Sequence, residues 1–449
     1  MNKYIILILL VCLSLFQKSA NAQEYLNTLL QPEQVSEDLE QWLTFLNKTH
    51  PQLSYTVDNV DAFHADVEKL KASITQPISI LELWRHVSVF NSVLSDGHTV
   101  INLPKIKTLA NQHVKNGGGL FPFEVVFRND KLIIKSQING EATAYRGNEI
   151  THINGVNTSK FIAPLLKRTN GDSVLFRRAL LQRRLAEYIW LYYGEIDSFV
   201  LTLNKYGQQQ IKTFAASHDE FNLDDNFEEQ FSFEILDKNS ALLTLNTFSW
   251  GAEYKRVIDF LHQSFSQIAQ NKIDHLIIDI RENGGGDDVI WIDGILPYLA
   301  DKKWRTGSKY KAKIIEGRAD EGETIGDVVE GENSFRELDP KVNKFTGDVS
   351  VLISSFTYSS SILFANVIQD HQFGQLVGER TGGKSGQTGG TQFKSLKHSN
   401  LSVVSPFFYL ERPKGGENHM SVTPDIEINY DKTIPEQLVN KLLNQRNVN

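Results

Sequence analysis

A serine at the junction of a predicted buried strand and a predicted helix is the first candidate for chemistry in this chain. The run Val349–Ser354 is apolar and β-branched, as in a buried strand, and the residues after Ser361 suit a packed helix. Ser359 therefore falls where the unpaired N–H groups of a helix start face any negative charge that develops beside its hydroxyl. On this segment alone, a serine that merely caps the helix is the simpler interpretation.

Two other stretches bring polar or flexible groups to the ends of predicted elements. His98 follows an Asp-Gly pair that ends a helical region, and a satisfied histidine in a turn is the simpler interpretation. Gly284–Gly286 follow the predicted strand His275–Ile280, at the end of a strand where ligands bind in α/β proteins. Neither phosphate-binding glycine motif is present, so a nucleotide loop fits this run poorly.

The composition is that of an ordinary globular protein with room for two or three domains. The chain has 449 residues, 41% of them hydrophobic and 22% charged, with a formal net charge of −8. It has no Lys/Arg-rich block, which argues against a nucleic-acid partner. No His-Glu-x-x-His or similar ligand cluster is present either, and we expect neither a metal nor an organic cofactor.

Residues 1–22 have the pattern of a secretory signal peptide. An apolar run at residues 4–16 precedes the small-x-small cleavage site Ala20-Asn-Ala22, and this run is too short to span a bilayer comfortably. The single cysteine, Cys12, lies inside the segment. We therefore expect an exported protein, periplasmic or secreted, that starts at Gln23 and has no cysteine, no disulfide and no stable membrane anchor.

The rest of the chain divides into parts by its periodicity. Residues 23–115 show a helical spacing of apolar side chains, which predicts an N-terminal helical layer. Residues 116–205 are rich in strand and turn signals. Between residues 230 and 430 strands alternate with helices, which predicts right-handed βαβ units and a mainly parallel sheet. Residues 431–449 are expected to close the chain with a helix.

A resemblance to PDZ domains is carried by residues 147–155. Their sequence, Gly-Asn-Glu-Ile-Thr-His-Ile-Asn-Gly, is similar to the Gly-Asp-x-Ile-x-x-Ile-Asn-Gly run of that family. The resemblance implies a module that binds an extended peptide by adding a strand to its sheet. Any small β-module that turns on Asn154-Gly155 would give the same pattern.

The C-terminal half resembles the C-terminal processing peptidases, or tail-specific proteases, and their tricorn-like and interphotoreceptor retinoid-binding-protein-like relatives. The motifs that carry this match are Asp279-Ile-Arg-Glu-Asn-Gly-Gly-Gly286, Thr357-Tyr-Ser359-Ser-Ser-Ile and Gly378-Glu-Arg-Thr-Gly-Gly-Lys384. The resemblance implies an α/β fold, with a Clp-protease/crotonase-like, mainly parallel sheet, an N-terminal helical layer and a PDZ-like β-module. It also implies a serine-type peptidase that acts on polypeptide substrates.

Carried over residue by residue, the resemblance places Ser359 as the nucleophile that forms an acyl-enzyme. The amides of Gly285, Gly286 and Ser360 would form the oxyanion hole, and Asp370 would support the site. The serine motif departs from the Ser-x-Ser-x-x-Glu pattern of the family, but the departure leaves the nucleophile in place.

Two candidates for the general base follow from the same resemblance. Lys384 matches the lysine of the tail-specific branch, and the register from Ser359 through Asp370 to Lys384 holds without a gap, which favours it. The pKa of a lysine must fall from ~10.4 to roughly 7 through burial before the amine serves as a base. The alternative is the tricorn-like pair of His98 with Glu417, and an imidazole needs almost no such change.

The leading prediction is an exported serine peptidase, and the alternative is a non-catalytic protein of the same fold that binds peptides or hydrophobic ligands. The presence of Ser359 together with two candidate bases favours catalysis. Acyl-CoA chemistry on a crotonase-like sheet fits less well, since no motif suggests nucleotide binding. The sequence does not indicate an oligomeric state.

Overall fold

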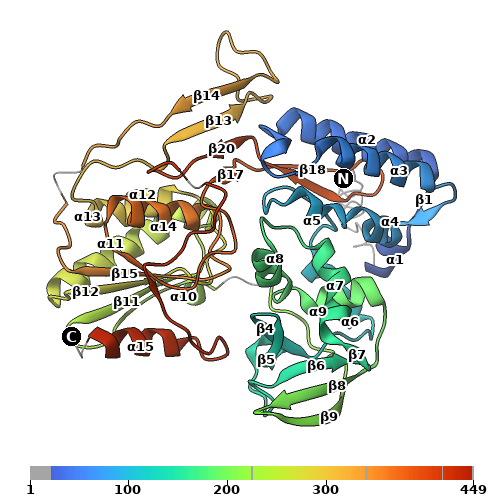
Figure 1. Cartoon of the computed structure of the whole chain (residues 1–449), viewed down its shortest axis with the longest axis horizontal. Coiled ribbons are helices and arrows are strands. Elements are labelled where there is room, and N and C mark those ends of the chain that lie inside the picture. Colours follow the sequence, from blue (N-terminus) through green and yellow to red (C-terminus); the bar gives the residue numbers. More distant parts are fainter. Residues whose placement is uncertain (1–21, 224–225, 339–341, 417, 447–449) are drawn as a thin grey trace, which may run out of the picture.

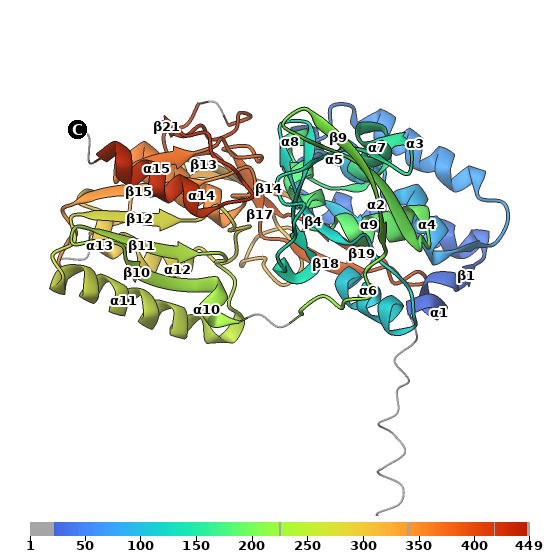
Figure 2. The same ribbon diagram turned by 90° about the horizontal axis from the view of Figure 1, so that it is seen from below.

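The computed structural model describes residues 22–223, 226–338, 342–416 and 418–446 (Figure 1). Residues 1–21 of the predicted signal peptide, with Cys12, and the candidate Glu417 lie outside the described residues. Within these ranges no helix combines the length and the apolar character needed to cross a membrane. The described chain forms two bodies, one from the N-terminal half and one from most of the C-terminal half (Figures 1 and 2).

The N-terminal layer consists of helices that each bury an apolar face, as predicted. Its elements are α1 (Ala22–Asn27), β1 (Leu29–Leu30), α2 (Pro32–Thr49), α3 (Val60–Ser73), β2 (Ile78–Ser79), α4 (Ile80–Val87), α5 (Phe90–Leu94), β3 (Val100–Asn102) and α6 (Ile106–Lys115). In α4 the Ser79 hydroxyl accepts from the Glu82 amide while the Glu82 carboxylate accepts from the Ser79 amide, a reciprocal cap that fixes the helix start. Behind this cap Leu83 and Trp84 are fully buried.

The module that follows is an antiparallel sheet backed by helices. The sheet has the order β4–β5–β6–β8–β9, with β7 paired to β6. Its elements are β4 (Phe123–Arg128), β5 (Lys131–Gln137), β6 (Glu149–Ile153), β7 (Val156–Asn157), α7 (Thr158–Arg168), α8 (Val174–Leu181), α9 (Leu185–Tyr193), β8 (Ser198–Lys205) and β9 (Gln208–Ala215). Asn154 and Gly155 both have positive φ and turn β6 into β7, so the predicted Asn-Gly hairpin is confirmed. The likeness to PDZ domains stays a prediction, and the sheet continues beyond the predicted boundary at residue 205.

The layer and the module share one hydrophobic core. Trp84 of α4 lies edge-on to Tyr188 of α9, with 5.7 Å between the ring centroids. Asn102 joins the same two rings, since its Oδ1 accepts from Trp84 Nε1 at 2.7 Å and its Nδ2 donates to the Tyr188 hydroxyl at 3.0 Å. The predicted boundary at residue 115 therefore does not separate two cores.

The C-terminal body is organised on a six-stranded sheet with the order β10–β11–β12–β15–β16–β21. These strands are β10 (Phe231–Ile235), β11 (Ser240–Leu245), β12 (His275–Asp279), β15 (Asp348–Ile353), β16 (Gln375–Gly378) and β21 (Ile426–Glu427). The first pair is antiparallel, and every later neighbouring pair is parallel. The central strands β12 and β15 are nearly continuous apolar runs because both faces of the sheet are covered.

Helices cover the two faces of this sheet (Figures 1 and 2). On one face lie α11 (Tyr254–Gln270), α12 (Val289–Gly294), α13 (Leu296–Leu299) and α14 (Ser360–His371), and on the other lies α15 (Glu436–Arg446). α11 is amphipathic, and Val257, Leu261 and Phe265 lie on its buried face. Residues 289–299 form two helices, α12 and α13, rather than one, because Pro297 has no N–H to continue the hydrogen-bond ladder. A short helix, α10 (Phe227–Gln230), precedes β10.

Two smaller sheets connect the bodies. One sheet contains the hairpin of β13 (Lys309–Lys313) and β14 (Val328–Glu332). β13 also pairs with β20 (Phe408–Leu410), whose other neighbour is the edge strand β17 (Gln387–Gly389). The hairpin of β18 (Gln392–Ser395) and β19 (Ser402–Ser405) pairs instead with β3 of the N-terminal layer. A segment that the sequence assigned to the peptidase core is therefore part of the N-terminal body.

Candidate active site

Ser359 lies on a sharp turn between β15 and α14, as the sequence pattern predicted. Its backbone has φ 56° and ψ −127°, a region that residues other than glycine rarely adopt. Hydrogen bonds from the turn to the end of β12 hold this shape: Thr357 Oγ1 donates to the Ile280 carbonyl at 2.9 Å, and Ser354 Oγ donates to the Arg281 carbonyl at 2.6 Å. The turn presents the Ser359 hydroxyl at the N-terminus of α14, as in a nucleophile elbow.

The glycine run after β12 packs directly against this serine. Asn283 is fully buried and fixes the run, since its Nδ2 donates to the Leu245 carbonyl and its Oδ1 accepts from the Gly285 amide, both at 2.9 Å. The Asn283 carbonyl also accepts from the Tyr358 amide at 3.2 Å. A Cβ at Gly285 would lie 2.6 Å from Ser359 Cβ, so only glycine allows this approach.

The predicted oxyanion donors differ in their availability. The Gly285 amide already donates to Asn283, so this donor is engaged. The amides of Gly286 and Ser360 donate no hydrogen bond to any residue within the described ranges. Gly286 has φ 142°, and a Cβ there would lie 2.1 Å from the carbonyl carbon of Phe248. The two free amides flank Ser359 in the fold and remain the candidate donors.

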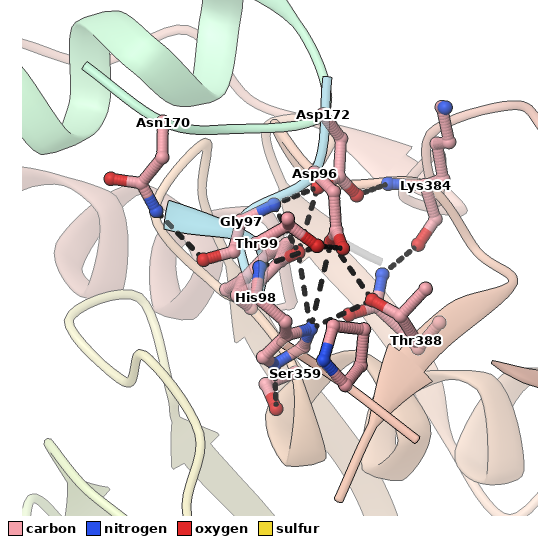
Figure 3. A network of polar contacts seen from close by, with 12 residues as sticks. Asp96, Gly97, His98, Thr99, Asn170, Asp172, Ser359, Lys384 and Thr388 are labelled. Atoms are coloured by element: carbon pink, nitrogen blue, oxygen red, sulfur yellow. Dashed lines mark hydrogen bonds and ion pairs between the residues drawn. The ribbon is translucent and has the colours of Figure 1, made fainter. Parts of the chain in front are cut away.

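His98 reaches the serine from the other body of the protein. Its Nε2 lies 2.9 Å from Ser359 Oγ, across 261 residues of sequence (Figure 3). The imidazole packs on the ring of Tyr358, with 4.9 Å between the centroids, and its side chain is only 12% exposed. Gly97 makes this packing possible, because a Cβ there would lie 2.5 Å from the Tyr358 ring.

Lys384 lies beside the site, but its ammonium group does not. The Lys384 amide donates to Asp172 Oδ2 at 2.9 Å, while the side chain points away from Ser359 (Figure 3). The structure thus brings an imidazole nitrogen of His98, rather than the Lys384 ammonium, within hydrogen-bond reach of Ser359. The uninterrupted register from Ser359 to Lys384 did not indicate this arrangement, because spacing along the chain does not set the direction of a side chain on a loop.

Asp370 lies at the opposite end of α14 from Ser359, about 16 Å away along the helix axis. Its side chain is 4% exposed and pairs with Arg412, with 2.5 Å from Arg412 Nη2 to Asp370 Oδ1. Asp370 Oδ2 also accepts from the Lys414 amide at 2.9 Å. Asp370 thus anchors the segment that leads to Glu417, and any support that it gives to Ser359 is indirect.

Three residues around His98 were not among the predicted site residues. Thr388 Oγ1 lies 3.0 Å from His98 Nδ1 and donates to Asp96 Oδ1 at 2.8 Å (Figure 3). Asp172 accepts from the Tyr358 hydroxyl at 2.7 Å, and burial, followed by the charge of Asp96, raises the pKa of Asp172. Asp96 is part of the Asp-Gly-His-Thr motif and could have been found there, whereas Thr388 and Asp172 lie in no motif.

A cavity of about 1480 Å³ opens over Ser359 and His98. Its volume exceeds that of typical small-ligand pockets, and it extends over strand β17. Its apolar lining includes Phe176, Leu180, Phe356, Phe393, Val404 and Phe408. Among the residues that the structure describes, no three His, Cys, Asp or Glu side chains are grouped as metal ligands.

Comparison with known proteins agrees with the motifs. Residues 239–428 match the profile of Peptidase family S41. The "Tail-specific protease" of Haemophilus influenzae is 22% identical over 187 residues, which are 40% of this chain and 22% of that protein. The chain thus matches about a fifth of the length of this curated relative.

Solved structures share the fold over nearly the whole chain. The crystal structure of mature CPAF has a TM-score of 0.63 at 12% identity, over 92% of this chain and 98% of that chain. The structure of mature CPAF complexed with lactacystin has a TM-score of 0.64 at the same identity and the same coverage. The resemblance predicted from the motifs is therefore confirmed: this is a mixed α/β chain whose residues 239–428 match Peptidase family S41.

Proposed function

We propose that this protein is an exported serine peptidase that cleaves polypeptides through an acyl-enzyme on Ser359, with His98 as the general base. The observation that carries the proposal is the 2.9 Å contact between His98 Nε2 and Ser359 Oγ at a strained strand-to-helix turn. The match to a peptidase family supports the serine peptidase class. The tail-specific type has weaker support, from a relative of 22% identity.

The proposed reaction uses groups whose positions the structure describes. His98 Nε2 takes the proton of the Ser359 hydroxyl as its Oγ bonds to the substrate carbonyl carbon, and the amides of Gly286 and Ser360 face the oxyanion. The imidazolium then gives its proton to the leaving amine as the C–N bond breaks. A water then loses a proton to the same Nε2 as its oxygen bonds to the acyl carbon. The bond from that carbon to Ser359 Oγ breaks, and the imidazolium returns the proton to Oγ.

Substitutions at three residues test this mechanism. Ser359→Ala should abolish peptide hydrolysis and labelling by a fluorophosphonate, and His98→Ala should lower kcat by at least about 10³-fold, because the members of a catalytic unit act together. Lys384→Met should change kcat by less than about tenfold, since its ammonium points away from the serine. If the His98→Ala protein kept its turnover while the Lys384→Met protein was inactive, the general base would be Lys384 rather than His98.

The alternative function is binding of peptides or hydrophobic ligands without hydrolysis. Labelling by the fluorophosphonate distinguishes it from the serine peptidase. The cavity of about 1480 Å³ with its aromatic lining would suit such a ligand as well as a substrate. A folded wild-type protein that is not labelled at Ser359 and cleaves no unfolded protein would support the binding function. Labelling that is lost in Ser359→Ala would support the peptidase.

Export is proposed from residues 1–22 alone, whose sequence is that of a signal peptide. Expression of the full chain in a Gram-negative host, followed by N-terminal sequencing of the exported protein, should give Gln23 as the first residue. A mature protein that retained Cys12, or that stayed in the cytoplasm, would contradict this proposal.

A further inference from the structure

The second nitrogen of His98 faces a hydroxyl group rather than a carboxylate. Thr388 Oγ1 lies 3.0 Å from His98 Nδ1, whereas the Tyr358 hydroxyl lies at 3.5 Å and Asp96 Oδ1 at 3.9 Å. Of these three, only the contact with Thr388 has the length of an ordinary hydrogen bond. A serine–histidine pair normally needs an acceptor at Nδ1 that holds the imidazole in the correct tautomer.

The direction of each hydrogen bond around Thr388 is fixed by elimination. The Thr388 hydroxyl has one hydrogen, and it donates this hydrogen to Asp96 Oδ1 at 2.8 Å, because an ionised carboxylate can only accept. The Thr388 oxygen is then the acceptor for His98 Nδ1–H. With its hydrogen on Nδ1, the imidazole leaves Nε2 free to accept the proton of Ser359.

Asp96 is built to stay ionised inside the protein. Its side chain is 2% exposed, and it accepts from the Thr388 hydroxyl, from the Thr99 hydroxyl at 2.6 Å and from the His98 amide at 3.0 Å. His50 Nε2 lies 3.9 Å away and carries the hydrogen, since His50 Nδ1 accepts from the Gln52 amide. Burial alone would raise the pKa of Asp96, but His50, the charge of His98 and Thr99 together hold it below its usual value.

We propose that Thr388 and Asp96 form a positioning relay in which the hydroxyl passes the charge of the buried carboxylate to His98 Nδ1. The proposal rests on the proposed function and extends it, because it assigns the third member of the catalytic group to residues other than Glu417. No proton moves to Asp96 during the reaction. The relay fixes the tautomer of His98 and stabilises the imidazolium that forms when Ser359 loses its proton.

The fold holds both residues of the relay in ordered elements. Thr388 is the middle residue of β17, where it lies opposite Tyr409 of β20, and Asp96 belongs to the turn between α5 and β3. The two residues thus come from different bodies, and the hydrogen bond between them links positions 292 residues apart in the sequence (Figure 3). A change of one hydroxyl at Thr388 should therefore alter the chemistry before it alters the fold.

The test compares three threonine variants of the full-length mature protein on one reporter peptide. Thr388→Val keeps the shape but removes the hydroxyl, and we expect kcat to fall by about 10²–10³-fold with KM changed by less than about threefold. Thr388→Ser restores the hydroxyl and should recover activity to within about tenfold of the wild type. Thr158→Val is the matched control, because Thr158 is buried and its hydroxyl donates to the Ile150 carbonyl of the module, far from the site.

The pH profile separates a positioning role from simple packing. The titratable groups around the imidazole are Asp96, His50, Asp172, Tyr358 and Asp288, and Thr388→Val leaves all five in place. Loss of the relay removes stabilisation from the imidazolium, so the pKa seen in the acidic limb of kcat/KM should fall by at least about 0.5 unit. A packing defect would lower kcat without moving this limb.

Substitution of the carboxylates shows which one completes the site. In Asp96→Asn the new side-chain amide can donate to Thr388, so the Thr388 hydroxyl would donate to His98 Nδ1 instead. The imidazole hydrogen would then lie on Nε2, which could no longer accept the proton of Ser359. Activity should therefore fall by at least about 10³-fold. Glu417→Gln should cost less than about tenfold. Wild-type kcat and an unmoved acidic limb in Thr388→Val would overturn the relay, while loss of activity in Glu417→Gln alone would assign the role to Glu417.

The relay and the proposed function fail in different ways. If fluorophosphonate labels the wild type but Thr388→Val keeps wild-type turnover, only the relay is wrong. If the folded wild type is neither labelled nor active, the proposed function itself is wrong, and the relay with it.

Discussion

At the scale of single residues, the site depends on a backbone conformation of Ser359 that residues other than glycine rarely adopt. A positive φ at a residue such as Ser359 costs on the order of 1–3 kcal/mol, and it persists only where the surroundings hold it. Here they are the buried side chains of Asn283 and Thr357, which tie the turn to the ends of β11 and β12. The unfavourable backbone conformation of Ser359 is therefore what places its hydroxyl in the site.

Gly285→Ala tests how closely the glycine run must approach the serine. The new Cβ would lie 2.6 Å from Ser359 Cβ and 3.1 Å from Ser359 Oγ, so we expect the hydroxyl to be displaced and kcat to fall by at least about 10²-fold. The matched control is Gly155→Ala, which adds a methyl group at a similar positive φ of 77° with no atom within 4 Å. Equal losses of activity in the two variants would show that general backbone strain, rather than contact with Ser359, is responsible.

At the scale of elements, the hairpin of β18 and β19 does most to align the two halves of the site. It follows β17 in the chain yet pairs with β3, which begins two residues after His98, with Val403 opposite Ile101. The strand that carries Thr388 and the turn that carries His98 are thus tied together by neighbouring sheets. The buried Leu401 anchors this hairpin in the N-terminal core.

Leu401→Ala should loosen this connection. Leu401 is fully buried, and its truncation should lower the free energy of unfolding by about 2–5 kcal/mol, as measured by urea denaturation. Phe393→Ala in the same hairpin is the control, because Phe393 is 73% exposed and its loss should change the free energy of unfolding by less than about 0.5 kcal/mol. A stable Leu401→Ala protein would mean that the hairpin contributes little to the N-terminal core.

At the scale of the whole molecule, one buried acid outside the catalytic group makes stability depend on pH. Glu187 of α9 is 1% exposed, and its Oε1 has no hydrogen-bond partner among the described residues. Burial raises the pKa of Glu187 from 4.5 to about 7, although the positive charges of Lys107 and Arg184 oppose the change. The folded protein therefore binds a proton at Glu187 that the unfolded chain releases near its ordinary pKa.

The sign of the effect follows from this difference. A raised pKa stabilises the folded state fully below pH 4.5, and the contribution is lost as the pH rises through about 7. Glu187→Gln should abolish this dependence and should raise the free energy of unfolding at pH 8 by up to about 3 kcal/mol relative to the wild type. The measurement is urea denaturation at pH 5 and pH 8, with the exposed Glu33→Gln as control. A wild type and a Glu187→Gln protein with parallel pH profiles would contradict the assignment.

Sequence reasoning succeeded where the information is local. The Asn154-Gly155 turn and the place of Ser359 between strand and helix both follow from periodicity and turn chemistry within about 20 residues. It did not predict the contact between His98 and Ser359, because that contact spans 261 residues and depends on how two bodies dock. The sequence around Thr388 gives no indication of its contact with His98, since threonines are common on strands.

The assembly of the site from two bodies also orders events while the chain is made. A ribosome delivers Asp96 and His98 first, then Ser359, and only afterwards Thr388 and the hairpin of β18 and β19. An unfinished chain that ends before residue 388 contains both the imidazole and the serine but lacks the strand that would fix their alignment. On the proposed function, peptidase activity would therefore arise only late in synthesis, once the strand that carries Thr388 has been made.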